Sequence, residues 1–193
     1  YYVVFMILGF RSRKVFFDYL GSEVVGLEST AGNLLGFLNL AELGIGMSVT
    51  YFLYKPLFSK DYEEINKIVA LQGWIYRRVA YLVIGGAVVL MCFFPQIFHG
   101  MKLPMWYAYA IFGAFLFNSL LGYFINYRQI VLNTDQKGYK VTRVTTGVGV
   151  ALKILQIVML PIVPSPFLFY VGTTLFSTVF SCWWLNRTID KEY

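Results

Sequence analysis

Charged side chains stand inside long apolar runs of this 193-residue sequence. Arg11, Arg13 and Lys14 lie in the first apolar run, Glu42 lies between two later runs, and Lys153 lies inside another. At the centre of a bilayer such a charge costs roughly 2.5 to 3.5 kcal/mol on insertion scales, so it normally faces a bundle interior or a wet cavity. Guanidinium and ammonium groups there attract anions, and guanidinium forks bind phosphate oxygens well. The pattern predicts an anion-binding cavity between helices.

Uncharged polar side chains recur at helical spacing on the same or neighbouring segments. Together with the charged residues they form a polar face on each helix. Two interpretations are open. The polar faces pair with one another and hold a bundle together, or they line a water-filled, net-cationic cavity. Cations outnumber anions in these segments, and an unpaired charge is costly in a site without water. For the polar residues taken together this favours the water-filled cavity, whereas for any single residue pairing is favoured. The predicted uncharged cavity residues are Asn39, Asn118, Gln129 and Gln156.

Glu42 lies at a similar depth to Arg11 and Lys153 when positions are counted along the apolar segments, close to the bilayer midplane. We expect Glu42 to face the cavity opposite Lys153 or Arg11. Glu42 then either pairs with a cation and has no other role, or it exchanges a proton as a substrate leaves and couples transport to an ion gradient. The sequence leaves both roles open.

The segments that carry these residues are long and apolar. Hydrophobic residues make up 58% of the chain and charged residues 13%, against about 25% charged residues in a typical soluble domain. An apolar stretch of about 20 residues crosses a bilayer as a helix. We predict an all-α integral membrane protein, a bundle of six transmembrane helices at residues 1–20, 29–54, 79–98, 105–127, 141–162 and 166–186.

A more polar stretch, residues 55–78, follows the second predicted span. Asp61 can cap a helix there, and Glu63 and Glu64 suit its first turn. Apolar residues then recur at helical spacing, which predicts an amphipathic helix along the cytoplasmic interface that runs into the third span.

Basic residues set the predicted orientation. Lysine and arginine are enriched in cytoplasmic connections of membrane proteins. Both ends of the chain are therefore expected in the cytoplasm, and the net charge of +6 requires no nucleic-acid partner. Lys102 alone lies in the opposite connections, whereas eleven basic residues lie in or beside the alternate ones and at the C-terminal end: Lys55, Lys60, Lys67, Arg77, Arg78, Arg128, Lys137, Lys140, Arg143, Arg187 and Lys191.

Residues for other chemistries are sparse. Cys92 and Cys182 fall inside predicted spans as small core side chains, and His99 lies at a span end where a solvated imidazole is expected. No glycine-rich phosphate loop and no cluster of acid, base or metal-binding residues is present. We predict no metal, no cofactor and no enzymatic activity.

The sequence resembles the amino-terminal half of bacterial polysaccharide transporters, the O-antigen and capsule flippases of the multidrug/oligosaccharidyl-lipid/polysaccharide exporter superfamily. The resemblance covers essentially the whole chain and implies two six-helix lobes, in proteins of 12–14 helices, around a central cavity. Residues 1–193 would be the first lobe, a fragment that begins with Tyr and lacks the C-terminal lobe. The stretches that carry the resemblance are "RSRKVFFDYLGSEVVGL", "NLLGFLNLAELGIG", "YFLYKPLFSKDYEEINKIV" and "NYRQIVLNTDQKGYK".

The resemblance implies a substrate, an undecaprenyl-diphosphate-linked oligosaccharide moved across the bacterial inner membrane for O-antigen, capsule or exopolysaccharide synthesis. Partners implied are membrane lipid, the C-terminal lobe and a polysaccharide polymerase. The diphosphate would bind Arg11, Arg13, Lys14 and Lys153.

Alternative functions are a lipid II or drug exporter of the same superfamily, a polysaccharide-assembly enzyme, or a membrane subunit without transport activity. Four basic residues in the spans argue against a drug exporter, for which a more acidic cavity is expected. The absence of an acid, base or metal cluster in the longest polar connection argues against an enzyme.

Overall fold

The fold is helical throughout the part of the chain that the structure describes. The computed structural model describes residues 2–42 and 44–192, and no strand occurs among them, so the predicted all-α class is confirmed. The helices are α1 (Tyr2–Leu20), α2 (Ser22–Leu38), the 3₁₀ helix η1 (Asn39–Glu42), α3 (Ile45–Ser59), α4 (Tyr62–Cys92), α5 (Phe94–Ile97), α6 (Trp106–Phe124), the 3₁₀ helix η2 (Asn126–Arg128), α7 (Gln129–Thr134), α8 (Gly138–Met159) and α9 (Pro166–Ile189).

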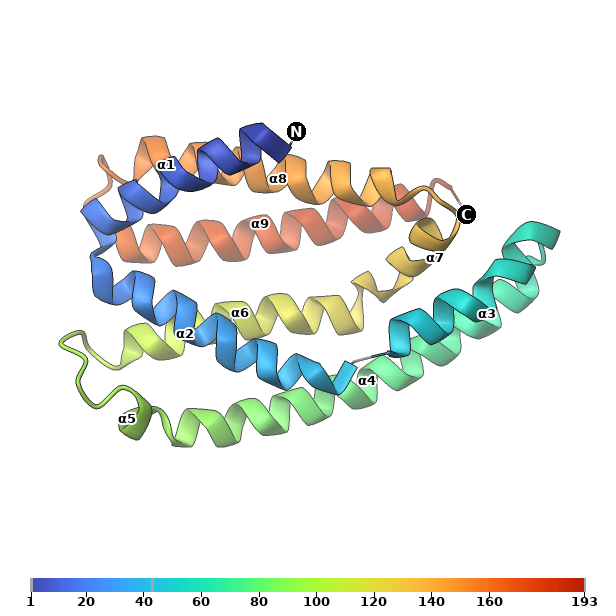
Figure 1. Cartoon of the computed structure of the whole chain (residues 1–193), viewed down its shortest axis with the longest axis horizontal. Helices are drawn as coiled ribbons and strands as arrows, with labels where there is room; N and C mark the ends of the chain where they lie inside the picture. Colours follow the sequence, from blue (N-terminus) through green and yellow to red (C-terminus); the bar gives the residue numbers. More distant parts are fainter. Residues whose placement is uncertain (1, 43, 193) are drawn as a thin grey trace.

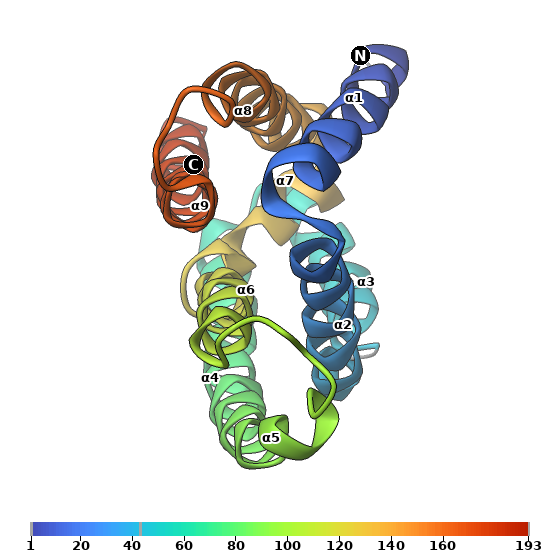
Figure 2. The ribbon, with the colours of Figure 1, turned by 90° about the vertical axis from the view of Figure 1, so that its left-hand side faces the viewer.

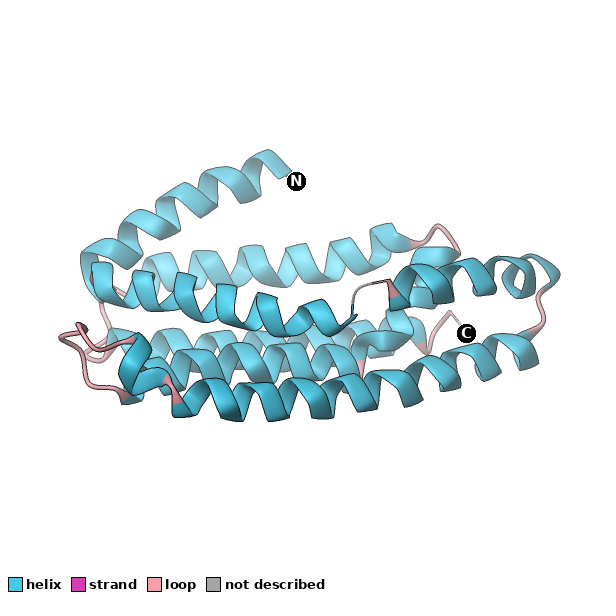
Figure 3. Cartoon of the chain, turned by 60° about the horizontal axis from the view of Figure 1, so that its bottom comes forward, coloured by secondary structure: helices cyan, strands magenta, loops and turns pink. Residues whose placement is uncertain are grey.

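The long helices lie roughly along one axis of the molecule. Following the chain, α1, α2 with α3, α4, α6 with α7, α8 and α9 run alternately in opposite directions along that axis (Figure 1). The loops gather at the two ends (Figure 3). One end holds the α1–α2, α5–α6 and α8–α9 connections, and the other holds the α7–α8 connection and the end of α9.

Within the described residues, four helices are long and apolar enough to cross a membrane: α4, α6, α8 and α9. Their outward faces carry large apolar side chains, such as Phe176, which is 70% exposed. Such a surface suits lipid, because hydrocarbon tails cover apolar side chains without cost. The four helices therefore indicate a multi-pass membrane protein. The predicted spans at 105–127, 141–162 and 166–186 correspond to α6, α8 and α9.

The predicted second span, residues 29–54, is not one helix. Helix α2 begins earlier, at Ser22, and ends at Leu38; η1 follows, and α3 begins at Ile45. Gly44 caps the start of α3 with φ 86°, in the left-handed region that glycine adopts at little cost. The apolar run of the sequence therefore hides a turn.

Helix α4 joins most of the predicted amphipathic segment to the third predicted span, since it begins at Tyr62, whereas residues 55–59 form the end of α3. Helix α4 is 31 residues long, about 46 Å at 1.5 Å per residue, which exceeds a bilayer core of about 30 Å. Its predicted cap is confirmed, because the Asp61 side chain accepts a hydrogen bond of 3.1 Å from the Glu64 amide. It ends at Cys92, short of the predicted residue 98, and Pro95 in the first turn of α5 prevents continuation of the helix. Helices α3 and α4 form a hairpin that extends beyond the other helices (Figure 1).

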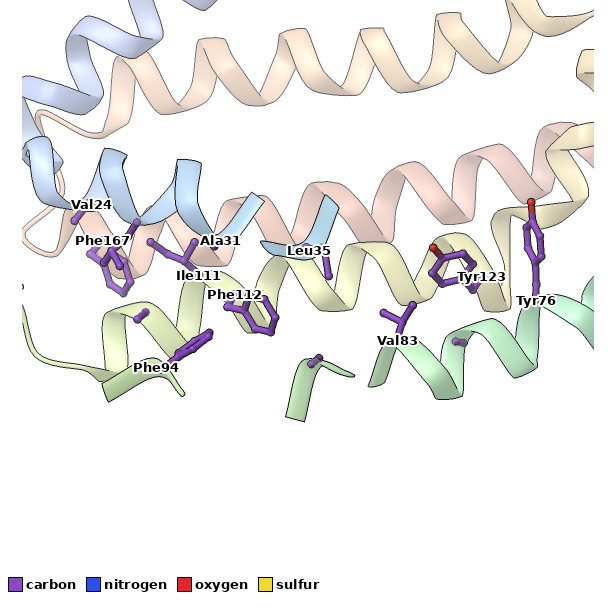
Figure 4. Packing of buried hydrophobic residues seen from close by; sticks show 14 residues of the cluster. Val24, Ala31, Leu35, Tyr76, Val83, Phe94, Ile111, Phe112, Tyr123 and Phe167 are labelled. Atoms are coloured by element: carbon purple, nitrogen blue, oxygen red, sulfur yellow. The ribbon is translucent and has the colours of Figure 1, made fainter. Parts of the chain in front are cut away.

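Helix α6 packs against α2, α4 and α9 and provides much of the core (Figure 2). Phe112 of α6 is fully buried, with its ring edge-to-face on Phe94 at 5.1 Å between centroids (Figure 4). Leu35 and Val83 bring α2 and α4 to the same cluster. This packing holds η1 against the middle of α4, where one of the polar cavities lies.

An ion-pair network ties the end of α9 to the α7–α8 connection. Arg128 lies 2.9 Å from Asp190, and Lys137 lies 2.7 Å from Asp135 and 3.4 Å from Glu192. Lys140 donates a hydrogen bond to the same Glu192 carboxylate. The network fixes one end of the bundle outside the membrane-spanning part of α9.

Replacing Gly73 of α4 with alanine tests a close contact between α4 and η2. An added Cβ would stand 2.8 Å from Cζ of Tyr127, so the ring must move, whereas a Cβ at Gly85 meets nothing within 4 Å. We expect Gly73→Ala to destabilise the protein by about 1–3 kcal/mol through overpacking, and Gly85→Ala to be neutral or stabilising by up to about 1 kcal/mol. Unfolding midpoints in detergent measure both; equal midpoints would contradict the contact.

Acidification is expected to release the end of α9. The hydrogen bond from Lys140 holds the pKa of Glu192 below its ordinary value. Stabilisation by this pair is therefore complete above the unfolded-state pKa of about 4.3 and is lost as the pH falls through the lowered folded value. Hydrogen exchange in the last turn of α9 should rise at low pH beyond the intrinsic trend. Glu192→Gln should reproduce the rise at pH 7, and Glu63→Gln, which breaks the exposed Glu63–Lys67 pair, should not.

Candidate functional site

Some of the predicted polar residues line two separate cavities. The first, the Glu42 cavity, has a volume of about 720 Å³ and lies between η1, α3, α4, α6, η2 and α7. The second, the Arg13 cavity, has a volume of about 690 Å³ and lies between α1, α2, α6 and α8. The Arg13 cavity meets α2 along its first half and middle, whereas the Glu42 cavity begins where α2 ends, so the two lie at different depths.

The Glu42 cavity is built around one carboxylate. The Tyr76 hydroxyl donates a hydrogen bond of 2.6 Å to Oε1 of Glu42. The turn at η1 and Gly44 brings Glu42 to this position, and the middle of α4 supplies Tyr76, which is buried. The Tyr76 ring packs edge-to-face on Tyr123 of α6, with 5.7 Å between centroids (Figure 4). The carboxylate is thus held by residues from three segments.

Polar groups beside this pair are also positioned. Oδ1 of Asn39 accepts hydrogen bonds from Ser119 Oγ at 2.9 Å and from the Tyr123 hydroxyl at 3.0 Å. Gln72, one turn before Tyr76, is 1% exposed, and its Oε1 accepts no hydrogen bond from the described residues. The remaining polar or aromatic lining residues are Thr50, Tyr51, Tyr54, Tyr127, Gln129 and Asn133.

The Arg13 cavity brings charges from three helices together. Arg13 comes from α1, Lys153 from α8 and Glu28 from α2. Two hydroxyl groups of the lining bond within their own helices: Ser12 donates to the carbonyl of Gly9, and Ser29 donates to that of Val25. The charged groups therefore determine what this cavity attracts.

The two linings have opposite formal charge. The Glu42 cavity contains one carboxylate and no lysine or arginine, which suits a cation or a ligand rich in hydroxyl donors. The Arg13 cavity contains two cations and one carboxylate, which suits an anion. Within the described residues, no group of three or more His, Cys, Asp or Glu side chains is placed to hold a metal ion.

The structure separates residues that the sequence analysis placed together. Glu42 contacts Tyr76 and lies in a different cavity from Lys153, instead of opposite Lys153 or Arg11. Of the four predicted basic site residues, Arg13 and Lys153 line one cavity, whereas Arg11 and Lys14 line neither; the three residues of α1 are all exposed. In α1, residue 13 lies on a different face from residues 11 and 14, which accounts for the division.

The predicted uncharged cavity residues also lie in different places. Asn39 and Gln129 line the Glu42 cavity. Asn118 is exposed on α6 and lines neither cavity, whereas Ser119, the next residue, lines the Glu42 cavity. Gln156 is buried and donates a hydrogen bond of 3.1 Å from Nε2 to Oγ1 of Thr173, which joins α8 to α9. For Gln156 the pairing interpretation is the better one.

Two lining residues escaped the sequence analysis. Tyr76 falls within residues 55–78, the segment predicted to lie along the membrane interface, but its hydroxyl bonds to Glu42 inside the bundle. Glu28 fell just before the predicted start of the second span at residue 29 and was read as part of a connection; α2 includes it. The useful signal was the i,i+4 spacing of Gln72 and Tyr76 in one helix.

Comparison of the chain with protein-family models, with curated proteins and with solved structures finds no match. The chemistry of the two cavities therefore carries the functional argument.

Replacing Tyr76 with phenylalanine tests the Glu42 contact. Loss of the hydroxyl leaves the carboxylate without its tyrosine donor, and polar contacts between membrane helices are worth about 0.6–1.7 kcal/mol. We expect Tyr76→Phe to lower the free energy of unfolding by about 1 kcal/mol, and Tyr81→Phe, whose side chain is exposed on the same helix, to leave it unchanged. A double-mutant cycle with Glu42→Gln isolates the coupling; a coupling energy of zero would contradict the contact.

Proposed function

We propose that this chain is the amino-terminal lobe of a flippase that moves an undecaprenyl-diphosphate-linked oligosaccharide across the bacterial inner membrane. The observation that carries the proposal is the convergence of Arg13 and Lys153 on one cavity, among helices of membrane-spanning type. A diphosphate headgroup is the part of such a substrate that needs cations, because it carries several negative charges.

The two cations have distinct tasks in this proposal. The Arg13 guanidinium offers a planar fork to two diphosphate oxygens, and the Lys153 ammonium acts as a point charge from the opposite wall. Glu28 limits the net positive charge of the lining, so that the diphosphate is released as well as bound. The polyprenyl tail stays in lipid beside the helices, which explains why the cavity needs no long apolar channel.

The arrangement of the helices supports a six-pass lobe with both chain ends in the cytoplasm. Alternating directions carry the chain from one end of the long axis to the other (Figure 1). The end that holds the α7–α8 connection and the end of α9 carries Lys137, Lys140 and Lys191, whereas Lys102 lies at the opposite end. This distribution favours the first end as the cytoplasmic one. Rocking of this lobe against a second lobe would then expose the cavity alternately to the two sides.

The Glu42 cavity favours a second candidate, an exporter of organic cations. Glu42 is surrounded by tyrosine rings, which attract cations through their faces, and no lysine or arginine competes for the carboxylate. The two candidates place the substrate in different cavities, so separate substitutions distinguish them.

Substitutions in the Arg13 cavity test the flippase. In the full-length protein, expressed in cells that lack their own flippase, Arg13→Gln and Lys153→Gln should each lower the surface polysaccharide about 10-fold to 100-fold. The matched controls Arg11→Gln and Lys14→Gln remove cations of the same helix that lie outside the cavity and should have little effect. Membrane levels of each variant are checked by immunoblot.

Equal losses from Arg11→Gln and Arg13→Gln would contradict the cavity assignment. Unchanged polysaccharide in Arg13→Gln and Lys153→Gln, combined with loss of resistance to cationic drugs in Glu42→Gln, would replace the flippase with the cation exporter.

A further inference from the structure

A long apolar groove lies between α8 and α9 on the outside of the bundle. Its volume is about 590 Å³, and apolar side chains such as Leu152, Leu155 and Phe176 form most of its walls. The hydroxyls of Thr173 and Ser177, which also line it, donate to backbone carbonyls of α9, so they present little polarity to the groove. Both walls are helices of membrane-spanning type.

The groove opens onto a cationic mouth. Phe180 and Trp184 line both the groove and an adjoining hollow of about 310 Å³ that also contains Arg187 and Lys191. Arg143 of α8 lines the groove itself. Because α8 and α9 are antiparallel, Arg143 near the start of α8 and Arg187 near the end of α9 lie at the same end of the bundle.

The aromatic side chains at the mouth pack on one another and on the Arg187 guanidinium. Trp184 packs edge-to-face on Phe180, with 5.6 Å between ring centroids, and the Arg187 guanidinium lies 5.5 Å from the centroid of Trp183. Neither Arg187 nor Lys191 makes an ion pair with another side chain within residues 2–42 and 44–192. Their charges are therefore available to an external anion.

We propose that this groove and its mouth bind one anionic glycerophospholipid of the inner leaflet. The acyl chain lies between α8 and α9, and the phosphate is held by Arg143, Arg187 and Lys191. The indole rings of Trp183 and Trp184 lie at the level of the lipid glycerol, where tryptophan is favoured. The site is independent of the Arg13 cavity, which lies on other faces of the bundle.

Charge and shape together select this occupant. Three cations at one end of an apolar groove complement a single anionic headgroup better than a zwitterionic one, because no carboxylate among the described residues lines the groove or its mouth to meet an ammonium. A groove of about 590 Å³ suits one ordinary acyl chain, whereas a polyprenyl tail is far larger.

Gly147 provides a steric test of the groove. It lies in the α8 wall, and a Cβ added there meets nothing within 4 Å, so a larger side chain would project into open groove space. Gly172 of α9 is equally unobstructed and does not line the groove, which makes it the matched control.

The experiment uses tryptophan quenching by brominated lipid chains. The protein, with Trp74 and Trp106 replaced by phenylalanine so that Trp183 and Trp184 report, is placed in phosphatidylethanolamine nanodiscs. Brominated phosphatidylglycerol should quench at a mole fraction several-fold lower than brominated phosphatidylethanolamine. Arg187→Gln and Lys191→Gln should each reduce that preference about fivefold, the effect expected for one cation at an anionic surface. Gly147→Leu should abolish the extra quenching, while Gly172→Leu and Lys102→Gln preserve it.

Equal quenching by the two brominated lipids would overturn the proposal, as would a preference that survives the combined Arg187→Gln and Lys191→Gln substitutions. Displacement of brominated phosphatidylglycerol by undecaprenyl phosphate more readily than by phosphatidylglycerol itself would also overturn it. Elution volume and helical content are measured for every variant, and the charge-retaining Arg187→Lys keeps the test valid if a neutral variant fails to fold.

Discussion

The cost of a polar group without partners in hydrocarbon governs where the segments of this chain lie. Glu42, Asn39 and Gln72 could not face lipid, so α4 and α6 enclose them, with tyrosine hydroxyls as hydrogen-bond donors to the first two. Arg13 and Lys153 line a second cavity together with Glu28 of α2. Apolar packing of α6 holds both arrangements in place, since α2 and α4 depend on the cluster around Phe112.

Long uniform helices could be predicted from the sequence because the signal is local. Helices α6, α8 and α9 match the predicted spans within a few residues, and their ends follow from turn residues such as Pro166. The second span was mistaken because an apolar run does not reveal a turn that a single left-handed glycine produces at Gly44. Hydropathy measures the free energy of transfer of side chains into lipid, so it does not show where the backbone turns within an apolar segment.

The site could be predicted only in part, for a physical reason. Periodicity along one helix shows which side chains share a face, and it correctly grouped Asn39 with Glu42. It does not show which helix lies opposite, because that depends on packing between distant segments. Glu42 therefore met Tyr76, 34 residues away, instead of Lys153. Arg13 and Lys153 came together although nothing in their spacing required it.

The interruption between α2 and α3 has a consequence for solvent. The first amide N–H groups of any helix lack acceptors inside it, and α3 begins beside the middle of α4. Ser48 donates its backbone N–H to the carbonyl of Gly44, and Gly46 and Met47 of the same first turn line the Glu42 cavity. The helix start therefore opens onto a polar cavity, so water that enters the Glu42 cavity can satisfy amides that the helix itself cannot.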